Sequence, residues 1–127
     1  QFENYIGILA GIPPEACEQR GTCSVQCVAE ADGRAYPCDF YALDEYCLGN
    51  YNENSIEEFF ESETAKQFVR ESLKHDETCR QCQNGCRRHR IRDEKTGAYR
   101  NYFCGGYRIF FEKCAPRMKE IAGYLGK

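Results

Sequence analysis

The chain has 127 residues, which is enough for one domain with a modest core and too few for two sizeable ones. Its 17 basic and 20 acidic side chains give a net charge of -3, so charge gives no reason to expect nucleic acid or an anionic membrane as a partner. The longest apolar stretch, residues 5–14, is broken by glycines and prolines and falls short of the roughly 20 residues that a membrane-spanning helix needs. We therefore expect a single cytoplasmic domain over residues 1–127. Because the chain begins at Gln1 and not at methionine, we also expect it to be a C-terminal fragment of a larger protein.

A β-hairpin is predicted around Asp32-Gly33, which is a favoured two-residue hairpin turn. The ten residues before the turn are mostly short and tolerated in strands, and residues 34–38 would return beside them. If the turn contains only these two residues, Cys27 lies directly opposite Cys38, with Cβ atoms about 5 Å apart. Without a metal, such a pair would suit a cross-strand disulfide.

Two helices are predicted between about residues 55 and 74. Ser55 and Glu58 have the spacing of a capping box at the start of the first helix, and Ser62 is a candidate cap for the second. Charged residues fall on the opposite side of each helix from the apolar residues, so both apolar faces are expected to be structural. The residues expected to face inward are Ile56, Phe59, Phe60, Ala65, Phe68, Val69 and Leu73.

The rest of the chain predicts cysteine-rich loops and one long helix. Residues 76–92 contain three cysteines around Gly85 and show no apolar period, which predicts a loop, and residues 93–98 predict a turn. A helix is expected at about 105–125 despite Pro116. Its apolar positions are Tyr107, Phe110, Phe111, Cys114, Met118, Ile121 and Leu125. The predicted fold class is α+β, with a small β-hairpin and cysteine-rich loops around metal clusters.

Ten cysteines are the unusual feature of the composition. Such a density has three physical explanations: disulfide bonds in an oxidising compartment, thiolate ligands for zinc, or thiolate ligands for iron-sulfur clusters. Disulfides can close loops of almost any spacing, whereas the Cys79-x2-Cys82 pair allows two thiolates to converge on one ion or one cluster edge. The spacing therefore favours metal over disulfide, and leaves zinc and iron-sulfur clusters open.

Two groups of cysteines and the residues between them carry a family resemblance. The groups are Cys17-x5-Cys23-x14-Cys38 and Cys79-x2-Cys82-x3-Cys86-x17-Cys104. They resemble the SPASM domain that follows the catalytic barrel of many radical S-adenosylmethionine enzymes. The phrases Glu30-Ala31-Asp32-Gly33, Tyr36-Pro37-Cys38-Asp39-Phe40-Tyr41 and Leu48-Gly49-Asn50 are similar to the anaerobic sulfatase-maturating branch of that family. The similarity extends from about residue 14 to residue 116.

The resemblance implies two auxiliary four-iron four-sulfur (4Fe-4S) clusters. The ligands that it implies for the first are Cys17, Cys23, Cys38 and Cys86, and those for the second are Cys79, Cys82 and Cys104. Because both sets combine distant parts of the chain, folding and cluster binding should be coupled.

The second implied set is one ligand short. The family usually has C-x2-C-x5-C-x3-C in the central loop, and this chain lacks one cysteine of that pattern together with its neighbours. Cys47 or His89 could reach the cluster from a loop and supply the missing ligand, or one iron could have an open coordination position. Cys114 is a poor candidate because ten helical residues would place it about 15 Å from Cys104. A zinc ion, or no metal, is the remaining alternative for this site.

Three further residues have both a functional and a structural interpretation. Asp39 resembles the proposed general base of the sulfatase-maturating branch, for which a carboxylate screened by a cluster could have a raised pKa. The alternative is that Asp39 caps a turn. Cys114 is expected in the core, where free cysteine is common. Cys47 is either a loop residue or a spare ligand.

The chain lacks the CxxxCxxC motif that radical S-adenosylmethionine enzymes need, because Cys23-x3-Cys27 is followed by Glu30 where the third cysteine would stand. We therefore expect it to bind clusters and to catalyse nothing alone, with S-adenosylmethionine bound only in the missing barrel of the parent enzyme. The resemblance implies that this barrel is one partner and that a protein or peptide substrate is the other. The parent would convert a cysteine or serine of a sulfatase to formylglycine without oxygen.

Three other functions stay open at this point. One is the auxiliary domain of a radical enzyme that modifies ribosomal peptides, because the domain is shared while the substrate is chosen elsewhere. The others are a zinc-binding structural or interaction module and a secreted disulfide-rich protein.

Overall fold

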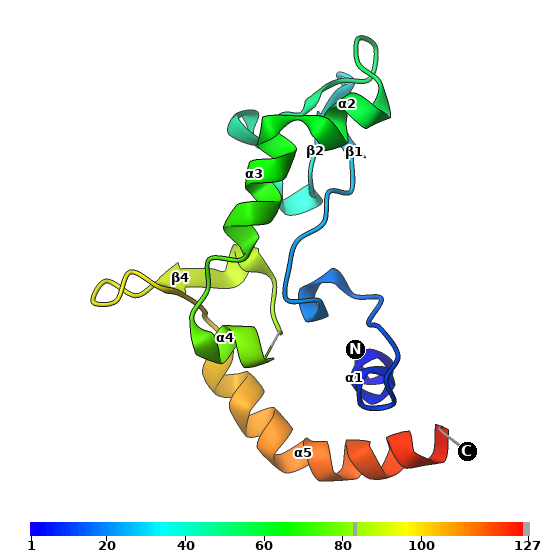
Figure 1. Cartoon of the computed structure of the whole chain (residues 1–127), viewed down its shortest axis with the longest axis vertical. Helices are drawn as coiled ribbons and strands as arrows, with labels where there is room; N and C mark the ends of the chain where they lie inside the picture. The colour runs from blue at the N-terminus through cyan, green and yellow to red at the C-terminus, as the bar shows by residue number, and fades with distance from the viewer. Residues whose placement is uncertain (83, 126–127) are drawn as a thin grey trace. The chain divides into compact units, whose positions relative to one another are not determined.

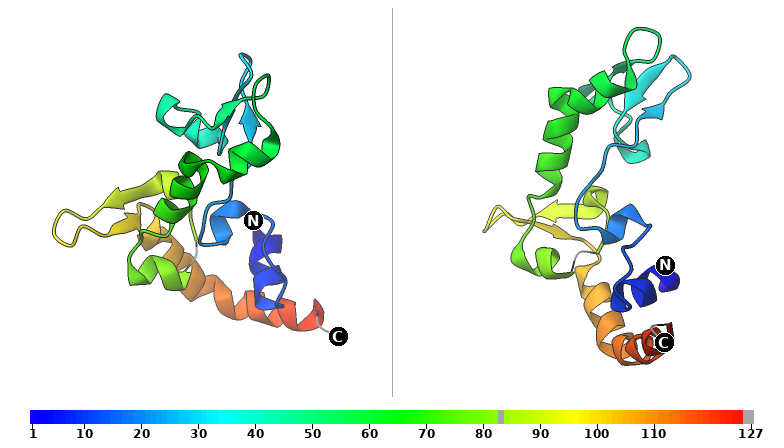
Figure 2. Two further views of the ribbon diagram at one scale, coloured as in Figure 1. Left: turned by 45° about the horizontal axis from the view of Figure 1, so that its top comes forward. Right: turned by 45° about the vertical axis from the view of Figure 1, so that its right-hand side comes forward.

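The computed structural model describes residues 1–82 and 84–125. The chain forms two compact units (Figures 1 and 2). Unit 1 combines Gln1–Gly21 with His75–Lys127, and unit 2 is the continuous segment Thr22–Lys74. Within the described ranges, no helix is both long and apolar enough to cross a membrane.

Unit 2 contains a three-stranded antiparallel sheet in the order β1-β2-β3. The strands are β1 (Val28–Ala29), β2 (Arg34–Tyr36) and β3 (Gly49–Asn50). Figure 1 shows β1 and β2 side by side. In this hairpin Val28 lies opposite Tyr36, and Ala29 lies opposite Ala35. The predicted hairpin is therefore confirmed, but its register differs by one residue.

The register differs because the turn holds three residues and not two. The N–H of Glu30 donates to the carbonyl of Arg34, and the N–H of Gly33 donates back to the carbonyl of Glu30, each at 2.9 Å. Gly33 has φ = +83°, which closes this longer loop at no steric cost. The predicted pairing of Cys27 with Cys38 is wrong: Cys27 lies outside β1 and has a left-handed backbone with φ = +51°.

The two predicted helices of unit 2 are confirmed as α2 (Ile56–Glu61) and α3 (Glu63–Ser72). The backbone N–H of Ser55 donates to Glu58 Oε2 at 2.7 Å, and the N–H of Glu58 donates to Ser55 Oγ at 3.3 Å. These two bonds form the predicted capping box. Ser62 caps α3 by accepting the N–H of Ala65 at 3.1 Å.

The core of unit 2 combines the sheet with both helices. Phe59 of α2 and Ala65 of α3 pack with Ala35 and Leu48 in one buried cluster. Phe68, also buried, makes edge contacts with the rings of Tyr41 and Tyr46. The inward direction of Phe59, Ala65 and Phe68 is confirmed, and Val69 is half-buried. Ile56, Phe60 and Leu73 are exposed, contrary to prediction.

Unit 1 is built on two helices, α1 (Phe2–Leu9) and α5 (Cys104–Leu125). The ring of Tyr5 contacts Phe110 and Phe111 of α5, with centroids 5.6 and 5.1 Å apart. The predicted helix at 105–125 is confirmed, including Pro116 in its interior, and Figure 1 shows that α5 is curved. Of its predicted inward positions Met118 is buried, whereas Ile121 and Leu125 are exposed, contrary to prediction.

The remainder of unit 1 is more regular than predicted. Residues predicted to be a loop form the helix α4 (Glu77–Cys82) and the strand β4 (Arg90–Arg92), which pairs with β5 (Tyr99–Asn101). Asp76 Oδ1 accepts the N–H of Cys79 at 2.8 Å and so starts α4 as a helix cap does. The predicted turn at residues 93–98 is confirmed as the connection of the β4-β5 hairpin (Figure 2).

Candidate cluster site

The short helix α4 carries two of the predicted ligands. Cys79 and Cys82 are three residues apart, so they share one face of the helix. Cys79 is buried, and its Sγ accepts the backbone N–H of Asn101 at 3.4 Å. The Sγ of Cys82 accepts a bond from Asn84 Nδ2 at 3.6 Å. Both sulfurs therefore accept a hydrogen bond from an N–H group.

The segments of Cys17 and Cys86 are joined within unit 1. Cys17 begins a 3₁₀ turn, Cys17–Gln19, and its side chain is exposed. The N–H of Gly85 donates to the carbonyl of Glu18 at 2.8 Å, which ties this turn to the residue before Cys86. Cys86 Sγ in turn accepts the N–H of Arg88 at 3.3 Å. Two of the ligands predicted for the first cluster thus lie on hydrogen-bonded neighbouring segments.

Cys104 is the first residue of α5 and lies near Cys79. Burial raises the pKa of the Cys79 thiol, and the charges of Asp76 and Cys104 raise it further against the opposing effect of the Asn101 N–H. The surroundings of Cys79 therefore favour its protonated form when no metal is bound. A bound cation must displace this proton, so metal binding at Cys79 releases a proton.

Three side chains beside the cysteines have buried polar atoms without a hydrogen-bond partner in residues 1–82 and 84–125. They are Gln19 with both amide atoms, Asn84 with Oδ1, and His75 with Nδ1. Gln19 follows Cys17 by two residues, Asn84 lies between Cys82 and Cys86, and His75 precedes Cys79 by four. Because buried polar groups are normally paired, these orphaned atoms fit a site that also holds a non-protein group. Across the same residues, no three His, Cys, Asp or Glu side chains converge as on a single metal ion.

The two predicted ligands in unit 2 also lie on neighbouring segments. The N–H of Cys23 donates to Ser72 Oγ at 3.0 Å, which ties the start of unit 2 to the end of α3. Three residues later, the N–H of Gln26 donates to the carbonyl of Pro37 at 2.8 Å. Cys38 directly follows Pro37, so the two segments that carry Cys23 and Cys38 run side by side.

Asp39 is the exposed first residue of a 3₁₀ turn, Asp39–Tyr41. The residue before this turn is Cys38, and Asp39 does not cap the turn with its side chain. No hydrogen bond of the Asp39 carboxylate is present within the described residues. The carboxylate is therefore exposed to solvent.

The other three cysteines, Cys27, Cys47 and Cys114, belong to neither of the two predicted ligand sets. Burial raises the pKa of Cys27, and Cys47 Sγ lies 3.6 Å from the carbonyl oxygen of Gly49. Cys114 is half-buried on α5, ten residues beyond Cys104 in one continuous helix. All ten cysteines are within the described residues, and no disulfide bond joins any of them.

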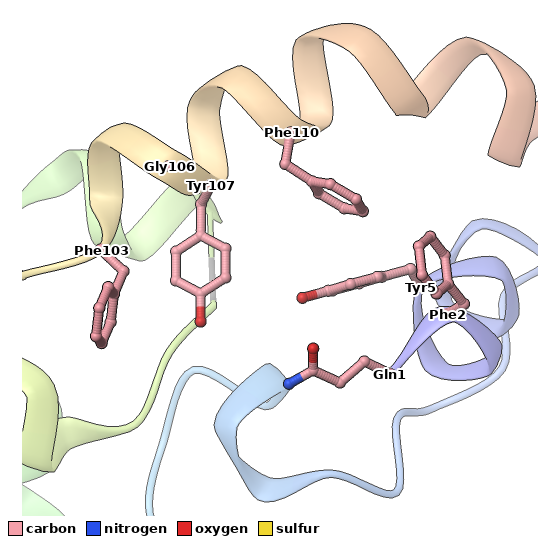
Figure 3. A pocket seen from close by; sticks show the side chains of 7 residues that line it. All are labelled: Gln1, Phe2, Tyr5, Phe103, Gly106, Tyr107 and Phe110. Atoms are coloured by element: carbon pink, nitrogen blue, oxygen red, sulfur yellow. The ribbon is translucent and has the colours of Figure 1, made fainter.

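An aromatic cavity of about 360 Å³ lies between the start of α1 and the start of α5. Its lining residues are Gln1, Phe2, Tyr5, Phe103, Gly106, Tyr107 and Phe110. Figure 3 shows the hydroxyls of Tyr5 and Tyr107 and the amide of Gln1 directed into the same space. Burial raises the pKa of both tyrosines, and the neighbouring Glu18 carboxylate and Cys82 thiol raise it further. The cavity therefore lies next to the segments that carry the unit 1 cysteines.

Three residues that contact the cysteine-bearing segments had little or no signal in the sequence. Asp76 precedes Cys79 by three residues, which is the spacing of an N-cap and could have predicted α4. Asn101 and Ser72 are polar residues that become buried, at 3 % and 0 % exposure. Their contacts join segments distant in sequence, and no local pattern predicts such contacts.

The fold and the cysteine-bearing segments define a small α+β protein built to bind metal through thiols. Comparison with known proteins agrees: residues 17–83 match the SPASM family, described as an iron-sulfur cluster-binding domain. The chain belongs to the SPASM family.

Curated relatives of the chain are anaerobic sulfatase-maturating enzymes. The cysteine-type enzyme of Clostridium novyi is 39 % identical over 98 % of this chain, which covers 35 % of that protein. The cysteine-type enzyme of Clostridium perfringens strain 13 is 40 % identical over 87 % of the chain and 31 % of that protein. The serine-type enzyme of Bacteroides thetaiotaomicron is 30 % identical over 92 % of the chain and 30 % of that protein. The chain thus spans about a third of the length of these relatives.

Solved structures agree with the sequence comparison. A structure described as native anSMEcpe with bound AdoMet and Kp18Cys peptide matches 97 % of this chain with a TM-score of 0.85 and 38 % identity. A second, with AdoMet and Cp18Cys peptide, matches 98 % with a TM-score of 0.86. This chain covers 36 % of each of those structures. These matches confirm the predicted α+β fold class.

Proposed function

We propose that residues 1–127 form one auxiliary cluster domain of a radical S-adenosylmethionine enzyme that matures sulfatases. The observation that carries this proposal is the hydrogen bonding that joins the cysteine-bearing segments of unit 1. It links the turn of Cys17 to Cys86, and α4 to the strand before Cys104. The barrel that binds S-adenosylmethionine would belong to the same parent chain, as the resemblance to the much longer relatives implies.

The proposed ligands follow the two cysteine sets of the resemblance. Cys79, Cys82 and Cys104 would hold one 4Fe-4S cluster, and all three lie in unit 1. Cys17, Cys23, Cys38 and Cys86 would hold the other, and this set rests on the resemblance. The orphaned polar atoms beside these residues and the N–H donors to the sulfurs support the fit of the ligands to the clusters.

The site of Cys79, Cys82 and Cys104 has three thiolates, and we propose that its fourth coordination position is open. Because α5 is continuous from Cys104 through Cys114, the helical rise separates these two residues by about 15 Å. This distance is too large for both to bind one cluster. An open iron would accept a small exogenous ligand such as a thiol or imidazole.

When bound, the clusters would supply one-electron transfer. The residues of this chain would then have two tasks. The N–H groups of Asn101 and Arg88 stabilise the thiolates of Cys79 and Cys86. The exposed carboxylate of Asp39 accepts a proton from the substrate side chain as a general base.

We propose that the substrate side chain is a cysteine of a sulfatase, which becomes formylglycine. The support is the higher identity to the cysteine-type relatives, 39 %, than to the serine-type relative, 30 %. The peptide in the matched structure is named Kp18Cys, which is consistent with this choice.

Anaerobic reconstitution with iron and sulfide tests the cluster assignment. The protein should become brown and bind iron and sulfide in the amounts of two four-iron clusters. A colourless protein that binds one or two zinc ions instead would show that the site is a zinc-binding structural module.

Single cysteine variants test the ligand sets. Cys79→Ala, Cys82→Ala and Cys104→Ala should each lose about half of the bound iron, because one of two clusters is lost. Cys114→Ala is the matched control on α5 and should keep all of the iron. Equal iron in the Cys104 and Cys114 variants would contradict the assignment.

Asp39→Asn in the full-length enzyme tests the general base. It should bind iron normally and lose about 10²–10⁴-fold in the rate of formylglycine formation on a cysteine peptide. Glu45→Gln, an exposed carboxylate six residues away, is the control and should retain activity. An active Asp39→Asn enzyme would remove Asp39 from the mechanism.

A further inference from the structure

Asn101, the last residue of β5, is a buried polar residue in the middle of the unit 1 cysteines. It is 3 % exposed. Its backbone N–H donates to Cys79 Sγ at 3.4 Å, and its side-chain Nδ2 donates to the carbonyl of Cys86 at 3.4 Å. Its Oδ1 accepts the N–H of Phe103 at 2.9 Å, one residue before Cys104 begins α5. One residue therefore contacts three segments that each carry a proposed ligand.

The turn before Cys86 is shaped to receive this side chain. A Cβ on Gly85 would overlap Asn101 Nδ2, and Gly85 also has φ = +94°, a conformation that favours glycine. The same glycine donates its N–H to Glu18 in the turn of Cys17. Asn101 is thus packed against the point where the segments of Cys17 and Cys86 meet.

We propose that Asn101 is the positioning residue that holds Cys79, Cys86 and Cys104 in place for the clusters. This inference rests on the proposed function and goes beyond it, because Asn101 is not a ligand. It also spans both ligand sets, since Cys79 and Cys104 belong to one cluster and Cys86 to the other.

The amide is the side chain that this position requires. It donates a hydrogen bond to the Cys86 carbonyl and accepts one from the Phe103 N–H at the same time. An aspartate would keep the acceptor and lose the donor, and its charge would lie close to the Cys79 sulfur. A negative charge near a cluster disfavours the reduced form, so the reduction potential should become more negative.

The test compares Asn101→Asp and Asn101→Ala with wild type after anaerobic reconstitution. Bound iron and sulfide, the electron paramagnetic resonance (EPR) spectrum of the reduced protein and its midpoint potential are measured, and circular dichroism reports on folding. Gln67→Glu is the matched control, because it makes the same amide-to-acid change at an exposed position of α3.

We expect Asn101→Asp to retain its helices, to bind less iron than wild type and to have a more negative midpoint potential with an altered EPR spectrum. Asn101→Ala should lose iron at both clusters, and Gln67→Glu should match wild type. If Asn101→Ala does not fold, Asn101→Asp decides, since it preserves the size and the acceptor of the side chain.

The outcomes separate this inference from the proposed function. A wild-type protein that binds no iron overturns the proposed function and this inference together. A wild-type protein that binds two clusters, with Asn101→Asp indistinguishable from it in iron content, EPR spectrum and potential, overturns only the role of Asn101.

Discussion

Ser72 Oγ accepts the backbone N–H of Cys23 at 3.0 Å, although the two residues are 49 positions apart in the sequence. The same hydroxyl donates to the carbonyl of Val69 at 2.6 Å and lies 3.2 Å from Thr22 Oγ1. Ser72 is fully buried at the end of α3. One small side chain therefore fixes the segment of a proposed ligand to the helix that follows the sheet.

Ser72→Ala should destabilise unit 2 by about 1–3 kcal/mol, because the partly buried N–H of Cys23 would lose its hydrogen-bond acceptor. Urea unfolding followed by circular dichroism measures this change. Ser24→Ala, an exposed serine close to Cys23 in the sequence, is the control and should be neutral. A Ser72→Ala protein as stable as this control would show that the bond contributes nothing.

Gly85→Ala should destabilise unit 1 for two reasons, the left-handed backbone and the overlap with Asn101. Replacing Asn101 by alanine removes the overlap but not the strain of the left-handed backbone. The double variant Gly85→Ala/Asn101→Ala should therefore be more stable than the sum of the single changes predicts, by about 0.5–3 kcal/mol. Strict additivity in a double-mutant cycle would mean that the two residues do not contact each other.

Removal of iron with a chelator should disorder unit 1 before unit 2. Unit 2 contains the buried cluster of Ala35, Leu48, Phe59 and Ala65, which gives it a core of its own. The buried apolar side chains of unit 1 in the described residues are fewer and include the thiol-bearing Cys79. A unit with few buried apolar side chains depends more strongly on its bound metal for folding.

Hydrogen exchange followed by mass spectrometry measures this difference. Peptides from residues 75–104 should lose protection on iron removal, and peptides from residues 55–72 should keep it. Equal loss in both segments would contradict separate stabilities of the two units.

The β1-β2 hairpin should weaken in acid because of Asp32. The backbone N–H of Arg34 donates to Asp32 Oδ1 at 3.1 Å, its guanidinium donates to Oδ2 at 2.6 Å, and both lower the Asp32 pKa below 3.8. A carboxylate with a lowered pKa stabilises the folded state above its unfolded pKa, and this stabilisation is lost as pH falls through the folded pKa. A nuclear magnetic resonance titration of Asp32 should therefore have its midpoint below 3.8.

Asp32→Asn should abolish the part of the stability loss at low pH that comes from this hairpin. Glu53→Gln, an exposed carboxylate in the loop before α2, should leave the sensitivity unchanged. A titration midpoint of Asp32 at or above 3.8 would exclude the proposed electrostatic stabilisation.

Local chemistry made some elements predictable. The capping box of Ser55 and Glu58 and the cap at Ser62 depend only on nearby residues, and the structure contains both. The helix α4 and the β4-β5 hairpin were missed because their residues have no apolar alternation. Ile91 of β4 and Tyr99 of β5 are exposed, so no buried face imposes a period on these strands.

Only the cysteines of the candidate site could be predicted from the sequence, because only they have a recognisable spacing. The spacing favoured metal over disulfide, and the family match agrees that the domain binds iron-sulfur clusters. The two ligand sets came from the resemblance alone. The roles of Asn101 and Ser72 depend on contacts between segments brought together by folding, which no spacing rule contains. The hairpin register failed for a related reason: Gly33 allows two turn lengths, and the sequence does not choose between them.

Unit 2 is a continuous segment inserted between the two halves of unit 1. During translation, all of Thr22–Lys74 is synthesised before α4, the β4-β5 hairpin and α5, and it leaves the ribosome ahead of them. This segment contains the whole core of unit 2 and both of its helix caps. Cys86 and its neighbours, which are bonded to the turn of Cys17, leave the ribosome later. The order of synthesis therefore lets the insert fold first and delays loading of the proposed clusters until Cys86 and its neighbours have left the ribosome.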